Sequence, residues 1–164
     1  MWCVGRGDRT GGRDYEYLYV TRDAGATWEN VSRVRRVLAP GAITGVYVDE
    51  AGRGVFTVLE SPSAASEGLE RPFNVFVTDA GDNWRSLFAP EGGGFRYKDS
   101  EALSTPVEGA YGEAGAVLFA GIGTVGELWA ALRDLRLDVR GDRVQIVCTL
   151  EIDGKTVENR LDFN

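Results

Sequence analysis

The chain has 164 residues, a length that fits one domain, and its 43% hydrophobic and 26% charged residues are typical of a globular protein. Twenty-two glycines and an aromatic share of 10% favour frequent turns and β structure. The net charge of −7 argues against nucleic acid as a partner, because protein binding neutralises phosphates with Lys and Arg. Histidine is absent, which excludes His-based acid–base catalysis, His-activated nucleophiles and His metal ligands.

The N-terminal residues 1–6 have no basic region and no long apolar run, so they do not form a signal peptide, although one could have been removed. Residues 115–132 are mostly apolar. They contain Glu127 and four glycines, however, and fit short core elements better than a membrane span. We therefore expect a soluble protein without membrane insertion.

The two cysteines, Cys3 and Cys148, lie in apolar runs near opposite ends of the chain. They are too few and too isolated for a zinc cluster, and we expect neither a metal nor a cofactor. Two interpretations stay open. They are two buried free thiols, or they form a disulfide between an N-terminal and a C-terminal strand, which requires Cα atoms within about 7 Å.

Two segments of the chain, residues 17–28 and 74–84, look alike. Each has an apolar strand, then Asp-Ala-Gly, then Trp five residues after the Asp, and the two aspartates are 56 residues apart. In the second copy Val77 stands where the first has a threonine, and Thr78 is displaced by one position. The shared residues are Thr21, Asp23, Gly25 and Trp28 in the first copy, and Asp79, Gly81 and Trp84 in the second.

These residue types suit a hairpin. The Asp carboxylate accepts hydrogen bonds from backbone N–H groups across the turn, and the Gly adopts a backbone angle that a Cβ would penalise. We expect the Trp to begin the returning strand and to pack its ring into the sheet. The residues resemble the Asp-box, or BNR, repeat, Ser/Thr-x-Asp-x-Gly-x-x-Trp, in which the turns lie on the outer rim of a β-propeller. The resemblance implies a structural role for both aspartates and leaves an extracytoplasmic location open.

The expected fold is all-β and antiparallel, with propeller-like blades: two Asp-box units and one degenerate unit. A second pair of similar segments, 45–57 and 109–120, reads as strand, acidic-Ala-Gly turn and strand. The expected elements are a partial blade with strands near 1–6, 15–21 and 27–34, a full blade with hairpins 43–60 and 72–88 joined by loop 61–71, and a third unit from residue 107.

The C-terminal third departs from this pattern. Thr124 and Glu127 form a capping-box sequence, so a short helix at 125–134 is as well supported as a third strand. Three strands then follow at 136–139, 143–152 and 155–163, joined at Asp153-Gly154 by a two-residue turn. They predict an antiparallel meander whose central strand buries alternate residues: Val144, Ile146, Cys148, Leu150 and Ile152.

The long loop at 89–106 contains the ligand-binding candidates Phe95, Arg96, Tyr97 and Lys98, because aromatic and cationic side chains suit acidic or sugar ligands. The alternative is a solvated surface loop.

Residues 1–164 are expected to form a single β-rich domain or a fragment of a larger propeller. Three blades do not close a ring, and an open set leaves a sheet edge that invites another chain, so a homodimer is one way to complete the blades. The resemblance implies a non-catalytic binding or assembly module with a protein or glycan partner. A small acidic inhibitor or immunity-type protein is a second hypothesis. A remnant of a sialidase-like glycoside hydrolase is a third, although the Arg-Ile-Pro signature is absent and no catalytic residue is assigned.

Overall fold

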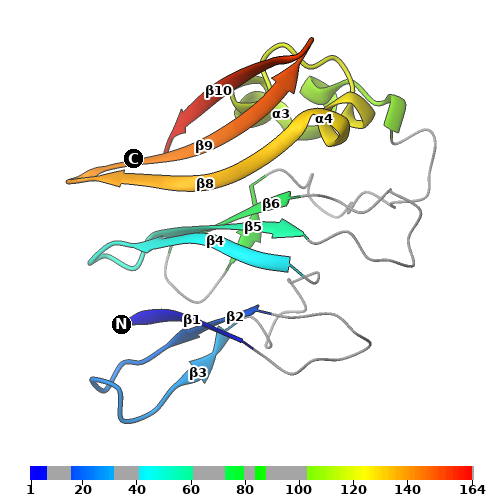
Figure 1. Cartoon of the computed structure of the whole chain (residues 1–164). Coiled ribbons are helices and arrows are strands. Elements are labelled where there is room, and N and C mark those ends of the chain that lie inside the picture. The colour runs from blue at the N-terminus through cyan, green and yellow to red at the C-terminus, as the bar shows by residue number, and fades with distance from the viewer. Residues whose placement is uncertain (7–15, 32–40, 61–72, 80–83, 88–102, 164) are drawn as a thin grey trace, which may run out of the picture.

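The structure of the protein is a computed structural model that describes residues 1–6, 16–31, 41–60, 73–79, 84–87 and 103–163. These residues form three antiparallel sheets and two helices (Figure 1). The first sheet, with the order β1-β2-β3, consists of β1 (Trp2–Arg6), β2 (Glu16–Val20) and β3 (Glu29–Asn30). The second, β4-β5-β6-β7, consists of β4 (Gly41–Val48), β5 (Gly54–Glu60), β6 (Phe73–Thr78) and β7 (Arg85–Ser86). The third, β10-β9-β8, consists of β8 (Leu132–Arg140), β9 (Arg143–Ile152) and β10 (Lys155–Asp162) and is preceded by α3 (Val107–Leu118) and α4 (Val125–Ala131).

The sheets form three layers, which we name the N-terminal, middle and C-terminal sheets (Figure 1). The prediction of mainly antiparallel β structure is confirmed, and so are the hairpins of the middle sheet. The three strands predicted before it are also present, although β3 is only two residues long. That these sheets are blades of a propeller stays a prediction.

The middle sheet has apolar side chains on both faces, which explains why β5 and β6 read as nearly continuous apolar runs. Val55, Val75 and Val77 belong to the core shared with the helices and the C-terminal sheet. On the opposite face, Phe56 and Phe76 stack at 4.7 Å in the core shared with the N-terminal sheet. The middle sheet therefore contributes to both cores.

Two side chains tie β4 to its neighbouring layers. Thr44 lies at the bulge between Ile43 and Gly45, and its hydroxyl donates to the Leu135 carbonyl of β8 at 2.5 Å. The backbone N–H of Ile43 donates to the carboxylate of Glu16 on β2 at 2.6 Å. A bulge frees a backbone N–H from the ladder and redirects a side chain, so β4 can form hydrogen bonds with both the N-terminal and the C-terminal sheet.

The predicted hairpin at 109–120, and with it the degenerate third unit, is wrong: the segment is α3. Val107, Tyr111 and Leu118 are buried along one side of this helix, a spacing that the Gly-rich turn signals concealed. Gly112 interrupts the helix with φ 61 and ψ −156, a conformation that only glycine adopts without strain.

The C-terminal third agrees closely with the sequence. The Thr124 side chain accepts from the Glu127 N–H at 3.3 Å, and the Glu127 carboxylate accepts from the Thr124 N–H at 3.0 Å, which completes the capping box. The helix ends at Ala131 because β8 begins at Leu132, earlier than predicted. The meander is confirmed, with Asp153 (φ 50) and Gly154 (φ 70) at its second turn. No helix within the described ranges has the length and apolar character needed to cross a membrane.

The structure has both cysteines free, so the proposed disulfide is wrong. Cys3 is exposed on β1 of the N-terminal sheet, whereas Cys148 is buried on β9 of the C-terminal sheet, with the middle sheet between them (Figure 1). The alternative of two buried thiols therefore holds only for Cys148. Burial, with a smaller contribution from the Asp134 charge, raises the pKa of the Cys148 thiol to about 12, so it stays protonated.

Candidate functional site

The turn of the first Asp-box-like segment is held by a set of hydrogen bonds around Asp23. Its carboxylate accepts from the Thr27 N–H at 2.9 Å, from the Thr27 hydroxyl at 2.5 Å and from the Thr21 hydroxyl at 2.8 Å. The Thr21 hydroxyl accepts in turn from the Gly25 N–H at 2.8 Å. Gly25 has φ 98, in the region that favours glycine. The predicted interactions of this aspartate are thus present, and they are internal to the turn.

These hydrogen bonds keep Asp23 ionised. The bonds from the Thr27 hydroxyl and N–H, and then from Thr21, lower the pKa of Asp23 from 3.8 to about 2. A carboxylate whose oxygens are occupied in this way fixes the shape of a turn and is poorly placed to hold a ligand.

The second turn is one residue shorter than the first. Val20 pairs with Glu29 in the first unit, whereas Val77 pairs with Arg85 in the second. The buried Thr78 follows Val77 as the buried Thr21 follows Val20, which explains the displaced threonine of the sequence. Asp79 is exposed, and residues 80–83, which include Gly81, lie outside the described residues.

The two Asp-box tryptophans have different surroundings. Trp84 is 6% exposed and packs edge-on against Phe56 at 4.9 Å and Trp2 at 5.6 Å. Its ring lies over Gly54, where a Cβ would be 2.8 Å from the ring. Trp28, in contrast, is 43% exposed. The expectation of a packed ring is thus confirmed for Trp84 and wrong for Trp28.

The ligand-binding candidates of the sequence, Phe95, Arg96, Tyr97 and Lys98, lie outside the described residues and stay a prediction.

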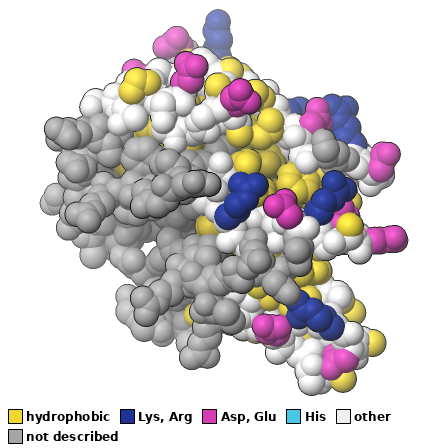
Figure 2. Space-filling model, turned by 180° about the vertical axis from the view of Figure 1, so that it is seen from behind, with side chains coloured by type: hydrophobic (Ala, Val, Ile, Leu, Met, Phe, Trp, Pro, Cys, Tyr) yellow, Lys and Arg dark blue, Asp and Glu magenta, His cyan; other side chains and the backbone are white. Residues whose placement is uncertain are grey.

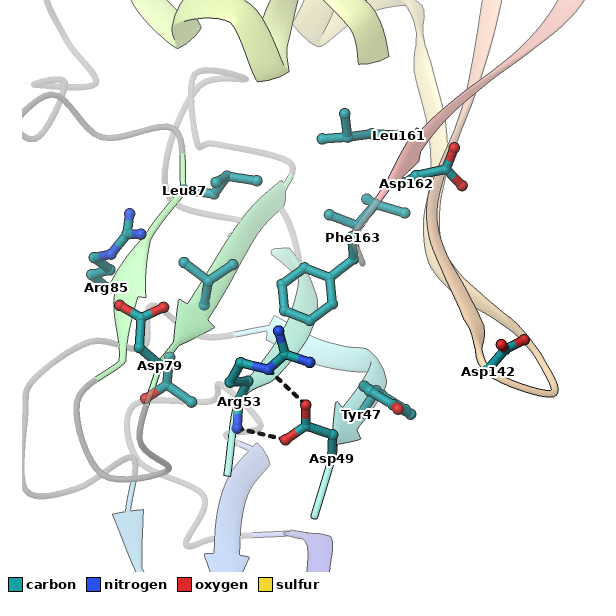
Figure 3. Close-up of a pocket in the computed structure, with 13 residues that line it drawn as sticks. Tyr47, Asp49, Arg53, Asp79, Arg85, Leu87, Asp142, Leu161, Asp162 and Phe163 are labelled. Carbon is teal, nitrogen blue, oxygen red and sulfur yellow. Dashed lines mark hydrogen bonds and ion pairs between the residues drawn. The ribbon is translucent and has the colours of Figure 1, made fainter. Parts of the chain in front are cut away.

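A cleft of about 540 Å³ opens between the middle and C-terminal sheets, at the end where several strands finish (Figure 3). We refer to it as the inter-sheet cleft. Its interior is apolar, and charged side chains surround its mouth. The lining residues are Tyr47, Asp49, Arg53, Val77, Thr78, Asp79, Arg85, Leu87, Asp142, Ile146, Leu161, Asp162 and Phe163.

Two carboxylates of the cleft are fixed by neighbouring cations. Asp49 accepts from the Arg53 N–H at 2.9 Å and from its Nε at 2.8 Å. Partial burial raises the pKa of Asp49, but the hydrogen bonds and charge of Arg53 outweigh burial and leave that pKa lowered. Asp162 accepts from Arg143 at 3.1 Å and from Gln145 at 2.8 Å, and the bond from Arg143 is the main cause of its lowered pKa. Both groups are therefore anions at neutral pH.

Aromatic side chains complete the cleft. The Phe163 ring points toward the Arg53 side chain from the opposite side of the cleft, and Tyr47 lies below the Phe163 ring (Figure 3). Phe163 is held in place because its N–H donates to the Val144 carbonyl at 2.9 Å. Seen from behind, hydrophobic side chains reach the surface between Lys or Arg and Asp or Glu side chains (Figure 2). The described surface thus offers apolar contact and charge side by side.

The sequence held a signal for this cleft that the repeat pattern obscured. Asp49 and Asp79 follow β4 and β6, and Asp162 ends β10, so each carboxylate lies at a strand end. Only the packing of the two sheets shows that these ends meet. Across the described ranges, no three His, Cys, Asp or Glu side chains gather in a group that could hold a metal ion.

The fold and cleft define a layered, mainly antiparallel β protein with a mixed apolar and acidic cleft. No known protein family, curated protein or solved structure matches the chain. The Asp-box resemblance therefore rests on the two turns alone.

Proposed function

We propose that this protein is a non-catalytic binding or assembly module, built from Asp-box units of the propeller type, that recognises a partner protein at the inter-sheet cleft. The observation that carries the proposal is the composition of the cleft. Four carboxylates and two guanidinium groups line an apolar interior to which both sheets contribute. Concave apolar sites with a few convergent polar groups are the usual form of binding pockets.

The charges favour a cationic group on the partner. Acidic groups outnumber basic ones in the cleft, and the whole chain carries a net charge of −7. Arg53 already pairs with Asp49 and Arg143 with Asp162, whereas Asp79 lies exposed among the lining residues. A protein segment that inserts an apolar side chain next to Lys or Arg fits this arrangement.

Two carboxylates of the cleft, Asp49 and Asp162, are poorly suited to proton transfer. An acid–base residue works best with a pKa near the operating pH. The pKa values of Asp49 and Asp162 are shifted the opposite way, below their usual range. Fixed anions of this kind attract a cation, which supports recognition rather than hydrolysis.

A glycan is the second candidate ligand. Tyr47 and Phe163 both line the cleft, and aromatic rings next to carboxylates suit contact with a sugar face and its hydroxyl groups. A neutral sugar would depend on the rings and little on the charge at the mouth of the cleft.

A displayed library of random peptides and a glycan array test the proposal with the intact chain. We expect enriched peptides to place Lys or Arg beside an apolar residue. The charge reversal Asp79→Lys should weaken their binding at least about tenfold, because an exposed attractive charge becomes a repulsive one. Glu113→Lys is the matched control, since Glu113 is exposed on α3 and does not line the cleft.

Equal loss of binding in both charge variants would contradict the cleft as the site. Binding to neutral glycans that Phe163→Ala abolishes and Asp79→Lys preserves would instead establish the glycan candidate.

A further inference from the structure

The N-terminal sheet is the outermost layer of the stack, and one of its faces packs on the middle sheet (Figure 1). That inner face presents Leu18 and Val20, both buried. Because side chains alternate along a strand, the neighbouring residues point the other way. The side chains of the opposite face, here termed the outer face, are Met1, Cys3, Tyr17, Tyr19, Trp28 and Asn30.

The outer face is apolar and aromatic. Met1 is 72% exposed and Trp28 43% exposed, and the Cys3 thiol is also exposed. The Tyr19 ring lies over Gly5 and meets the Tyr17 ring edge-on at 6.4 Å. Its strand side chains are uncharged, and no described element covers it (Figure 1). The Met1 ammonium, which donates to the Thr21 carbonyl, and the Asp23 carboxylate, which accepts from the Thr21 hydroxyl, lie at its edge.

The middle sheet shows what this kind of face does when it is covered. The strands of the two sheets can be matched by their register. Trp2 of β1 pairs with Val20 of β2, and at the equivalent place in the middle sheet Val55 of β5 pairs with Val77 of β6. By this correspondence Trp28 is the counterpart of Trp84. The strand residues Cys3 and Tyr19 are likewise the counterparts of Phe56 and Phe76.

In the middle sheet this face is buried by the next layer. The N-terminal sheet covers it and places the Trp2 ring against Trp84, 5.6 Å between centroids. Under this layer Trp84 is 6% exposed, whereas Trp28, whose face no described element covers, is 43% exposed. The outer face has the same arrangement of side chains, and none of the described elements covers it.

The charges on a second copy of the chain determine which of its faces can cover the outer face. The far end of the stack is the outward face of the C-terminal sheet, where ion pairs join all three strands. Arg136 pairs with Asp134 and Glu158, and Arg160 pairs with Asp138 and Glu158. Burying these charges against an aromatic face would cost their hydration without new partners. The strand side chains on the outer face of a second chain, in contrast, carry no charge.

We propose that two copies of this chain associate through the outer faces of their N-terminal sheets. The contact is two-fold symmetric, so each Trp28 packs against the aromatic face of the other chain. The net charge of −7 disfavours contact between charged faces, and the uncharged strand side chains of this face reduce the repulsion between two acidic molecules.

Size-exclusion chromatography with light scattering tests the proposal on the intact chain. The unmodified protein should have twice the chain mass of 17.8 kDa and dissociate on dilution. Trp28→Lys should give the single-chain mass, because it places a charge in the contact. Val117→Lys is the matched control, since Val117 is 47% exposed on α3, and it should remain a dimer.

Alkylation of Cys3 with iodoacetamide provides a second measurement. It uses the unsubstituted protein, so it does not depend on whether a variant folds. Cys148 is buried, so the labelling rate reports on Cys3. The rate should fall in proportion to the dimer fraction as the protein concentration rises. A single-chain mass at every concentration overturns the proposal. So does a dimer that Trp28→Lys leaves intact, or a Cys3 labelling rate that is unchanged by dimer formation.

Discussion

At the scale of single residues, Asp23 shows how one carboxylate specifies a turn. Its oxygens accept from Thr21 and from both the amide and the hydroxyl of Thr27, so three donors that the turn brings together are satisfied. The residue types alone predicted that the carboxylate would bridge the turn, because its partners are within four residues in sequence. Local interactions of this kind are what a sequence specifies best.

Replacing Asp23 with Asn should lower the melting temperature at neutral pH. The folded protein depresses the pKa of Asp23 from 3.8 to about 2, so the carboxylate contributes stability that is complete above 3.8 and disappears as pH falls through about 2. The gap in melting temperature between the two proteins should therefore close across that range. Thermal unfolding at a series of pH values measures it, and a gap that does not depend on pH would contradict the ionic role.

At the scale of elements, the two hairpins that resemble Asp-boxes are alike in sequence and differ in packing. The pattern predicted a buried ring for both Trp28 and Trp84, and only Trp84 is buried. The burial of a ring at the end of a hairpin depends on the sheet above it, which a pattern of a dozen residues does not contain. The same limit explains α3, where an acidic-Ala-Gly sequence typical of turns became helical because Tyr111 and Leu118 reach the core.

Trp84→Ala should cost about 3–5 kcal/mol of unfolding free energy, because it leaves a cavity beside Phe56 and Trp2. Trp28→Ala should cost less than about 0.5 kcal/mol when measured at high dilution, where the chain is a monomer. Urea unfolding of both variants makes the comparison. Similar losses for the two would mean that Trp28 is also packed within one chain.

At the scale of the whole molecule, the layers meet through contacts between residues far apart in sequence. The inter-sheet cleft depends on such contacts, because its carboxylates lie at the ends of three different strands: Asp49, Asp79 and Asp162. The sequence could mark each as a carboxylate at a strand end. It could not predict that they share one cleft, because that depends on how the C-terminal sheet lies on the middle sheet.

The ion pairs of the C-terminal sheet predict an acid-sensitive stability. Arg160 lowers the pKa of Asp138 and, after Arg136, that of Glu158. These carboxylates contribute stability above their ordinary pKa values of 3.8 and 4.5, and the contribution is lost as pH falls through their depressed values.

Arg160→Gln should therefore lower the melting temperature most near neutral pH, with the difference shrinking below about pH 4 and in about 1 M NaCl. Arg22→Gln is the control, because Arg22 forms an exposed pair with Glu29 outside this network and should have a smaller effect. A difference that persists unchanged in acid and in salt would show that Arg160 acts through packing.

The charged outward face of the C-terminal sheet also limits how far such molecules can assemble. A stack with an adhesive surface at both ends adds copies indefinitely and forms fibres. Here Arg136 and Arg160 hold one end in hydrated ion pairs, so only the other end can take a neighbour. In the dimer that we propose, both remaining ends are the charged outward faces of C-terminal sheets. The proposed assembly would therefore stop at two chains.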